Sequence, residues 1–229
     1  MKKTQKIIGD RSWTVRMDKP GDESAIEEVY VQDCYRLVPK LQELAASGCS
    51  PWILDVGGHV GAFSALVMKH LPQATVIAIE PFDESADIFE ANVHGPNVFL
   101  LRKALRHDGA NLLTDFKLST TGNKVVKPGQ DGGDYPGMCI VPTITISEIL
   151  DRFSVPFFDI TKMDCELSEH DILPVIAGVR KKFGLIVGEW HAMPSKEFKA
   201  GLITMFQDPV LQIEPSNSND TMGMFRIEL

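Results

Sequence analysis

Apolar residues after position 51 follow two alternating patterns along the chain. Short apolar runs, typical of buried strands, are separated by longer stretches in which apolar residues recur every three or four positions, as they do in helices. The expected strands are 52–56, 75–80, 97–101, 157–163 and 184–190, and the expected helices are 62–71, 83–94, 169–183 and 195–206. Because strands and helices alternate, we expect a doubly wound α/β fold whose mostly parallel sheet is covered by helices on both faces.

The two ends of the chain depart from this alternation. Residues 12–17 predict a short strand, and residues 22–47 have helical spacing that ends at Gly48, so together they form a preface before the sheet. Residues 210–215 and 222–229 predict two strands joined by a polar turn. This terminal hairpin would add one antiparallel strand to the sheet.

Length and composition are those of one globular domain. We expect a single domain over 1–229, with 1–50 as the preface and 51–229 as the core, because 44% of the residues are hydrophobic. The net charge of −8 gives no overall attraction to phosphate backbones, so nucleic acid is not an expected partner. The four cysteines form no C-x-x-C pair, and no apolar run reaches the roughly 18 residues of a membrane span. We therefore expect a cytoplasmic protein with reduced thiols and no membrane partner; a homodimer is left open.

The stretch ILDVGGHVG, residues 53–61, forms the turn between the first core strand and its helix. In a doubly wound sheet this turn lies at the ligand-binding edge. Gly57 and Gly58 permit close backbone approach to a ligand, and Gly61 lets the following helix pack close to the strand. The spacing D-x-G-G-x-x-G differs from the G-x-G-x-x-G of dinucleotide enzymes, which disfavours a nicotinamide or flavin cofactor.

Glu80 ends the second core strand, 25 residues after Asp55. A carboxylate at this position can accept both ribose hydroxyls of an adenosine group. Asp55 and Glu80 together make the pocket negative, which suits a sulfonium cation better than a pyrophosphate. The alternative is an ordinary tight turn beside an incidental glutamate. His59 is expected to face the methyl donor, and the residues around it do not indicate its role.

The ordered blocks ILDVGGHVGAFSALV, VIAIEPFDESADIFEANV, KALRHDG, TITISEIL, ITKMDCELSEHDIL and IVGEWH, between residues 51 and 191, resemble the FkbM family of S-adenosylmethionine-dependent methyltransferases. The resemblance implies the class I methyltransferase fold, a Rossmann-like sheet of seven strands, and S-adenosylmethionine as cofactor. It also implies cofactor-binding roles for Asp55, Gly57, Gly58, His59, Gly61, Glu80, Pro81, Phe82, Ala104 and Asp164.

Within that set the resemblance assigns different parts of the cofactor to different residues. Glu80 would hold the ribose, while Pro81, Phe82 and Ala104 would border the adenine. Members of the family are mostly O-methyltransferases acting on small molecules such as sugars and polyketides. The sequence departs from the family at His59, where asparagine is usual, and at Leu167, where glycine is frequent.

Polar residues after the fourth and fifth core strands supply the candidate chemistry. Asp164 and Glu166 follow one strand, Glu189 ends the next, and His191 comes directly after it, so we expect them to converge. His191 is the candidate general base because an imidazole is largely neutral near pH 7. Asp164 would hold the ammonium group of the cofactor or pair with His191, and Glu189 completes the catalytic set.

Two alternatives remain for these acids. Asp164, Glu166, Glu189 or His191 would hold a divalent cation, although no metal is the favoured prediction. The carboxylates would otherwise cap helices or pair with Lys162 and Arg180. We expect Glu169 and Asp171 to be surface acids favoured by the dipole of their helix.

The leading hypothesis is O-methylation of a hydroxyl on a small-molecule acceptor. A methyltransferase acting on RNA or protein is the enzymatic alternative, and a non-catalytic cofactor-binding module is the other. The loops near 109–140 are expected to shape the acceptor pocket, and the irregular middle of the chain is expected to contain hairpin segments such as CIVPTITI at 139–146. These loops carry no signature that identifies the acceptor.

Overall fold

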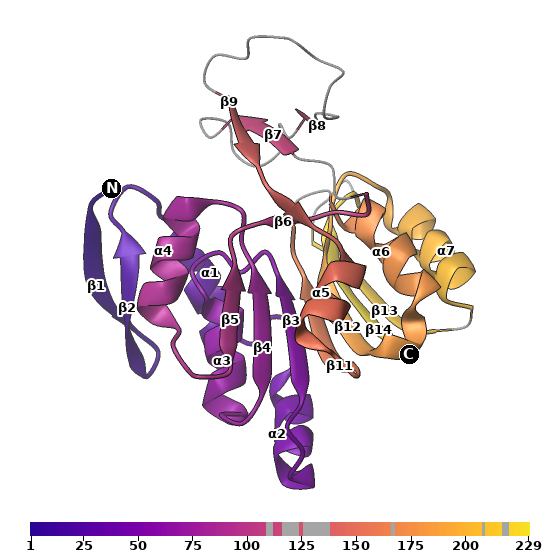
Figure 1. Cartoon of the computed structure of the whole chain (residues 1–229), viewed down its shortest axis with the longest axis horizontal. Coiled ribbons are helices and arrows are strands. Elements are labelled where there is room, and N and C mark those ends of the chain that lie inside the picture. Colours follow the sequence, from indigo (N-terminus) through magenta and orange to yellow (C-terminus); the bar gives the residue numbers. More distant parts are fainter. Residues whose placement is uncertain (109–111, 116–123, 126–137, 166–167, 208, 217–219) are drawn as a thin grey trace. The chain divides into compact units, whose positions relative to one another are not determined.

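The computed structural model describes residues 1–108, 112–115, 124–125, 138–165, 168–207, 209–216 and 220–229. Seven strands form one mixed sheet in the order β13-β14-β12-β11-β3-β4-β5 (Figure 1). The sheet is mostly parallel, with helices in the connections, so the predicted fold class is confirmed. The chain divides into two compact units, Met1–Arg102 and Lys103–Leu229. The expectation of a single domain over 1–229 stays a prediction.

The first unit contains three parallel strands of the sheet. They are β3 (Trp52–Val56), β4 (Thr75–Ile79) and β5 (Val98–Leu101), connected by helices α3 (Ala62–His70) and α4 (Asp83–Asn92). All five elements lie within one or two residues of the ranges that apolar spacing predicts. The strands are hydrophobic because both faces of a parallel sheet are covered, and Ile53, Leu54 and Ile77 are fully buried.

The N-terminal preface belongs to this first unit. Strands β1 (Lys3–Ile8) and β2 (Arg11–Arg16) form an antiparallel hairpin, which lies beside α4 in Figure 1. Sequence spacing predicts only the second of these strands. Three helical segments follow, namely α1 (Gly21–Ala25), a π-helical turn (Ile26–Val31) and α2 (Val38–Ser47).

The helical stretch predicted over 22–47 is therefore interrupted. Asp33 and Arg36 have positive φ angles of 50° and 54°, which end any regular helix. The Asp33 carboxylate then accepts hydrogen bonds from the main-chain N–H groups of Leu37 and Val38, both at 2.8 Å. These bonds satisfy main-chain donors at the start of α2, so Asp33 both ends the preceding helical segment and caps the next helix.

The second unit contains the other four strands of the sheet. Strands β11 (Phe158–Met163) and β12 (Phe183–Trp190) are parallel, and β14 (Gly223–Glu228) lies antiparallel between β12 and β13 (Val210–Pro215). The predicted antiparallel strand is thus confirmed. Helices α5 (Ile146–Phe153), α6 (Glu169–Gly178) and α7 (Ser195–Phe206) and the 3-10 turn Arg180–Lys182 complete this region.

Short strands occupy the described part of the middle segment. Strand β6 (Ala104–Leu105) pairs in parallel with β10 (Thr143–Ile144). Strand β7 (Leu112–Asp115) lies between β8 (Lys124–Val125) and β9 (Met138–Val141), antiparallel to both. Of the residues expected to contribute hairpin segments, 139–141 pair antiparallel with β7, whereas 143–144 pair in parallel with β6. Within the described residues no helix has the length and apolarity needed to cross a membrane.

Candidate functional site

The glycine turn joins β3 to α3 and is tied to the end of β4. The main-chain N–H groups of Gly57 and Gly58 both donate to the carbonyl oxygen of Ile79, each at 2.9 Å. Gly57 and Gly61 have φ angles of 81° and 87°, in the left-handed region that favours glycine. Main-chain hydrogen bonds therefore hold the start of the turn against the end of β4.

A side chain would clash at Gly61 and would fit only tightly at Gly58. A Cβ at Gly58 would lie 3.2 Å from the ring of Phe89, and one at Gly61 would meet Val93 Cγ2 at 2.5 Å and Phe89 at 3.3 Å. The sequence predicts that Gly61 brings its own helix close to the strand. The neighbours instead belong to α4 and the residue after it, so this glycine brings the turn close to a second helix.

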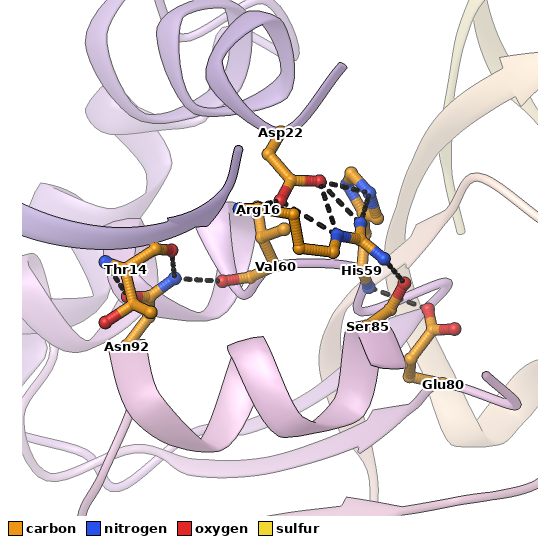
Figure 2. Close-up of polar contacts among 8 residues, drawn as sticks. All are labelled: Thr14, Arg16, Asp22, His59, Val60, Glu80, Ser85 and Asn92. Atoms are coloured by element: carbon orange, nitrogen blue, oxygen red, sulfur yellow. Dashed lines mark hydrogen bonds and ion pairs between the residues drawn. The ribbon is translucent and has the colours of Figure 1, made fainter. Parts of the chain in front are cut away.

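Glu80 directly follows β4 and is 4% exposed. Its Oε2 accepts a hydrogen bond from the main-chain N–H of His59 at 2.8 Å, and its Oε1 accepts one from the N–H of Phe82 at 2.9 Å (Figure 2 shows the first). These two bonds, one to each carboxylate oxygen, hold the plane of the group. This geometry suits the predicted role of Glu80 toward a ribose.

Asp55 lies near the end of β3 and is fully buried. Its Oδ2 accepts a hydrogen bond from the hydroxyl of Ser64 at 2.6 Å, which connects the strand to α3. Asp55 thus holds together the strand and the helix that flank the turn. Direct contact of Asp55, Gly57, Pro81 or Phe82 with a cofactor stays a prediction.

The ring of His59 points to the N-terminal preface. Its Nε2 lies 3.0 Å from an Nη of Arg16 and 3.4 Å from Oδ1 of Asp22 (Figure 2). His59 itself has a φ of 45°, uncommon for a residue other than glycine. Its connection to the expected ribose site runs through its main-chain N–H and Glu80, and contact of its ring with the cofactor stays a prediction.

In the second unit, the three predicted catalytic side chains lie together. Asp164 follows β11, Glu189 lies in β12 and His191 follows that strand. One ligating atom from each lies within 4.8 Å of the others, and His191 Nε2 is 3.7 Å from Glu189 Oε2. The predicted convergence of these three is observed, while their roles stay predictions. Glu166 lies outside the described residues, as does Leu167.

Glu169 is the important residue that the sequence analysis misplaced. It is fully buried, not a surface acid, and its Oε1 accepts hydrogen bonds from His191 at the main-chain N–H (2.8 Å) and at Nδ1 (3.0 Å). A signal exists in the sequence, because Glu169 is the first residue of the buried stripe 169, 172, 173 and 176 of α6. Asp171 is exposed, as expected.

The contact with Glu169 determines which nitrogen of the His191 ring carries the proton. An ionised carboxylate only accepts hydrogen bonds, so the Nδ1 of a neutral His191 carries the proton and Nε2 keeps the basic lone pair. His170 Nε2 contacts the carbonyl oxygen of His191 at 2.6 Å, which fixes the backbone of the residue as well. Asp164 lies 3.8 Å from the buried Lys162, the structural pairing that had been left open.

Comparison with known proteins identifies the domain. A family model described as "Methyltransferase FkbM domain" matches residues 55–214. The chain belongs to the FkbM methyltransferase family. Methyltransferase 1 of Beauveria bassiana is 25% identical over 103 residues, 44% of this chain and 39% of that protein. Methyltransferase sdnD of Sordaria araneosa is 26% identical over 87 residues, 38% of this chain and 31% of that protein. The chain thus matches less than half the length of either relative.

Solved structures support the fold of this FkbM methyltransferase domain. A SAM-dependent methyltransferase from Agrobacterium tumefaciens matches with a TM-score of 0.55 and 10% identity, over 99% of this chain and 70% of that chain. The METTL16 methyltransferase domain matches with a TM-score of 0.54 and 10% identity, over 93% and 82%. At these identities the likeness is one of fold alone. Ala104, predicted to border the adenine, is buried in β6 of the second unit, and that role stays a prediction.

Proposed function

We propose that this FkbM methyltransferase domain transfers a methyl group from S-adenosylmethionine to a hydroxyl of a small molecule. The observation that carries the proposal is the hydrogen bond between buried Glu169 and Nδ1 of His191. An unactivated hydroxyl must lose its proton as it attacks the methyl group, and this pair supplies an oriented base. An amine acceptor has less need of such a base.

The first unit supplies groups that fit an adenosyl cofactor. Glu80 offers a carboxylate whose plane is fixed by two main-chain donors, as hydrogen bonding to vicinal ribose hydroxyls requires. Gly58 and Gly61 let the turn pack against Phe89 and Val93, which holds it in place beside Glu80. S-adenosylmethionine supplies an electrophilic methyl group on a sulfonium with a neutral leaving group, so positioning accounts for much of the acceleration.

In the second unit, we assign the proton transfer to Nε2 of His191. This nitrogen accepts the hydroxyl proton while Nδ1–H stays bonded to Glu169, which stabilises the imidazolium that forms. Glu189, with Oε2 at 3.7 Å from the same Nε2, adds negative charge on the side that becomes positive. Asp164 is proposed to orient the acceptor or the cofactor ammonium.

A divalent cation is the alternative that the same residues support. Asp164, Glu189 and His191 each place one ligating atom within 4.8 Å of the others. Glu169 would then orient the histidine ligand, an arrangement common around bound metals. A cation held there would acidify the acceptor hydroxyl, and the base would be dispensable.

Calorimetry and a methyl-transfer screen test the proposed function. The purified chain is titrated with S-adenosylmethionine, its demethylated product S-adenosylhomocysteine and NAD, with Glu80→Gln as the matched variant. We expect the first two ligands to bind, NAD not to bind, and the variant to lose affinity. Labelled methyl transfer is then measured on hydroxyl and amine compounds, RNA and protein. Binding of NAD alone, or transfer to RNA or protein alone, would contradict the proposal.

A further inference from the structure

A contact between two side chains, Arg16 of the N-terminal preface and His59 of the glycine turn, connects these two segments. Arg16, the last residue of β2, directs one Nη to Nε2 of His59 at 3.0 Å. His59 directs its main-chain N–H to Glu80 Oε2 at 2.8 Å. Figure 2 shows these groups in sequence, from the preface to the proposed ribose-binding carboxylate. All of them belong to the first unit.

Arg16 is held in one position by a buried ion pair. It is 7% exposed, Asp22 is fully buried, and Arg16 Nε lies 2.9 Å from Asp22 Oδ2. Its main-chain N–H donates to the same oxygen at 2.9 Å, and its other Nη donates to Ser85 of α4 at 3.1 Å. Burial by itself raises the pKa of Asp22, but its contacts with His59 and Arg16 bring it well below its usual range. The carboxylate therefore stays ionised and the ion pair stays charged.

A second connection anchors the next residue of the turn to the same strand. Asn92, 2% exposed, accepts a hydrogen bond from the N–H of Thr14 at 2.7 Å and donates to the carbonyl oxygen of Thr14 at 3.0 Å. It also donates to the carbonyl oxygen of Val60 at 2.9 Å. Both His59 and Val60 are thus connected to β2, one directly and one through α4.

We propose that Arg16 and His59 are positioning residues of the cofactor site, through which the preface fixes the orientation of Glu80. The inference rests on the proposed function, because it assumes that Glu80 binds the ribose of the cofactor. The backbone of His59 has an uncommon conformation, with a φ of 45°, which costs conformational free energy. Its ring contact with Arg16 offsets that cost and keeps its N–H directed at Glu80 Oε2.

The consequence is that part of the cofactor affinity depends on the contact between Arg16 and the His59 ring, through the orientation of Glu80. Releasing the ring would let the turn at residue 59 relax and the Glu80 carboxylate rotate. The ground-state affinity for the cofactor would fall, while the methyl-transfer step at saturating cofactor would be unchanged. A purely structural contact would instead lower the melting temperature and leave affinity unchanged.

Two substitutions and one control test the inference. His59→Asn removes the ring contact with a residue that tolerates positive φ, and the wild-type side chain is 40% exposed, so the variant is expected to fold. Arg16→Lys keeps the charge but loses the planar fork of donors. Lys6→Gln removes an exposed ion pair with Glu23 in the same preface and serves as the control. Each full-length variant is titrated with S-adenosylhomocysteine, and its melting temperature is recorded.

We expect His59→Asn and Arg16→Lys each to weaken S-adenosylhomocysteine binding about tenfold, and the double variant to be no weaker than Arg16→Lys alone. The control should bind like the wild type. With an acceptor in hand, KM for S-adenosylmethionine should rise while kcat is retained. Wild-type affinity in both single variants, or a fall in melting temperature alone, would overturn the inference. Absence of binding by the wild type would instead refute the proposed function.

Discussion

Glu169 and His191 form a hydrogen-bonded pair in which one carboxylate oxygen receives both the main-chain N–H and Nδ1 of the histidine, at 2.8 and 3.0 Å. The carboxylate is fully buried, and the histidine side chain is 13% exposed. The pair therefore fixes the Nδ1 side of the ring, and Nε2 lies 3.7 Å from Oε2 of Glu189. Within the proposed function, this relationship makes His191 a base of defined tautomer rather than a histidine that happens to lie near acids.

The first prediction concerns the base itself. His191→Ala should lower kcat/KM about a hundredfold or more, because it removes the proton acceptor from the reacting group. Glu169→Gln should cause a smaller loss and shift the acidic limb of the pH profile, where His191 becomes protonated, to lower pH, since a neutral amide stabilises the imidazolium less than a carboxylate does. The measurement is the pH profile of kcat/KM. Asp171→Asn, exposed on the same helix, is the control, and an unchanged rate in His191→Ala would reject the base.

The second prediction separates the base from the metal. If His191 acts as a base, activity should survive exhaustive chelation and should not rise on addition of magnesium, manganese or zinc. The measurement is methyl transfer before and after dialysis against a chelator, with metal content determined on the same samples. Loss of activity that returns with a divalent cation would show that Asp164, Glu189 and His191 act as ligands.

The sheet could be predicted because its signal is local. Strand β3 matches the predicted 52–56, since its apolar residues are bounded by Pro51 and the glycine turn. The predicted helix over 22–47 failed at Asp33, whose left-handed backbone and side-chain cap leave no trace in hydrophobic spacing. Apolar periodicity reports which face is buried, and not where a polar residue turns the chain.

The candidate site could be predicted only in part, for a related reason. Glu80, Asp164, Glu189 and His191 were found because each lies in, or within one residue of, the carboxyl end of a predicted strand. The partners that orient them are remote in sequence: Glu169 is 22 residues before His191, and Arg16 is 43 residues before His59. Pairings of this kind depend on tertiary structure, although an acid on the apolar stripe of α6 is a signal that a sequence can carry.

The third prediction concerns the glycine turn. Gly61→Ala should destabilise the protein by about 1–3 kcal/mol, because an alanine at a φ of 87° is strained and its Cβ would meet Val93. Gly201→Ala is the matched control, since a Cβ there meets only Met205 at 3.5 Å within α7. That change should stabilise by up to about 1 kcal/mol, through helix propensity. Urea denaturation of both variants measures the difference, and equal effects would contradict the packing argument.

The fourth prediction concerns stability in acid. Contacts with His59 and Arg16 outweigh the effect of burial and lower the pKa of Asp22 in the folded protein. In the unfolded chain the pKa of an aspartate is about 3.9, so the folded state binds this proton less tightly. Asp22 therefore contributes stability that is present above about pH 4 and is lost as the pH falls toward its lowered folded-state pKa.

Asp22→Asn should remove this contribution. At pH 7 it leaves Arg16 as a buried cation without its carboxylate, a change that costs about 3–5 kcal/mol in comparable pairs. The free energy of unfolding should then fall less steeply than in the wild type as the pH is lowered below about 4, because one depressed carboxyl group no longer titrates. Urea denaturation between pH 7 and pH 3 measures both effects, with the exposed Asp18→Asn as control. Parallel pH curves for Asp22→Asn and the wild type would show that the ion pair does not contribute to acid sensitivity.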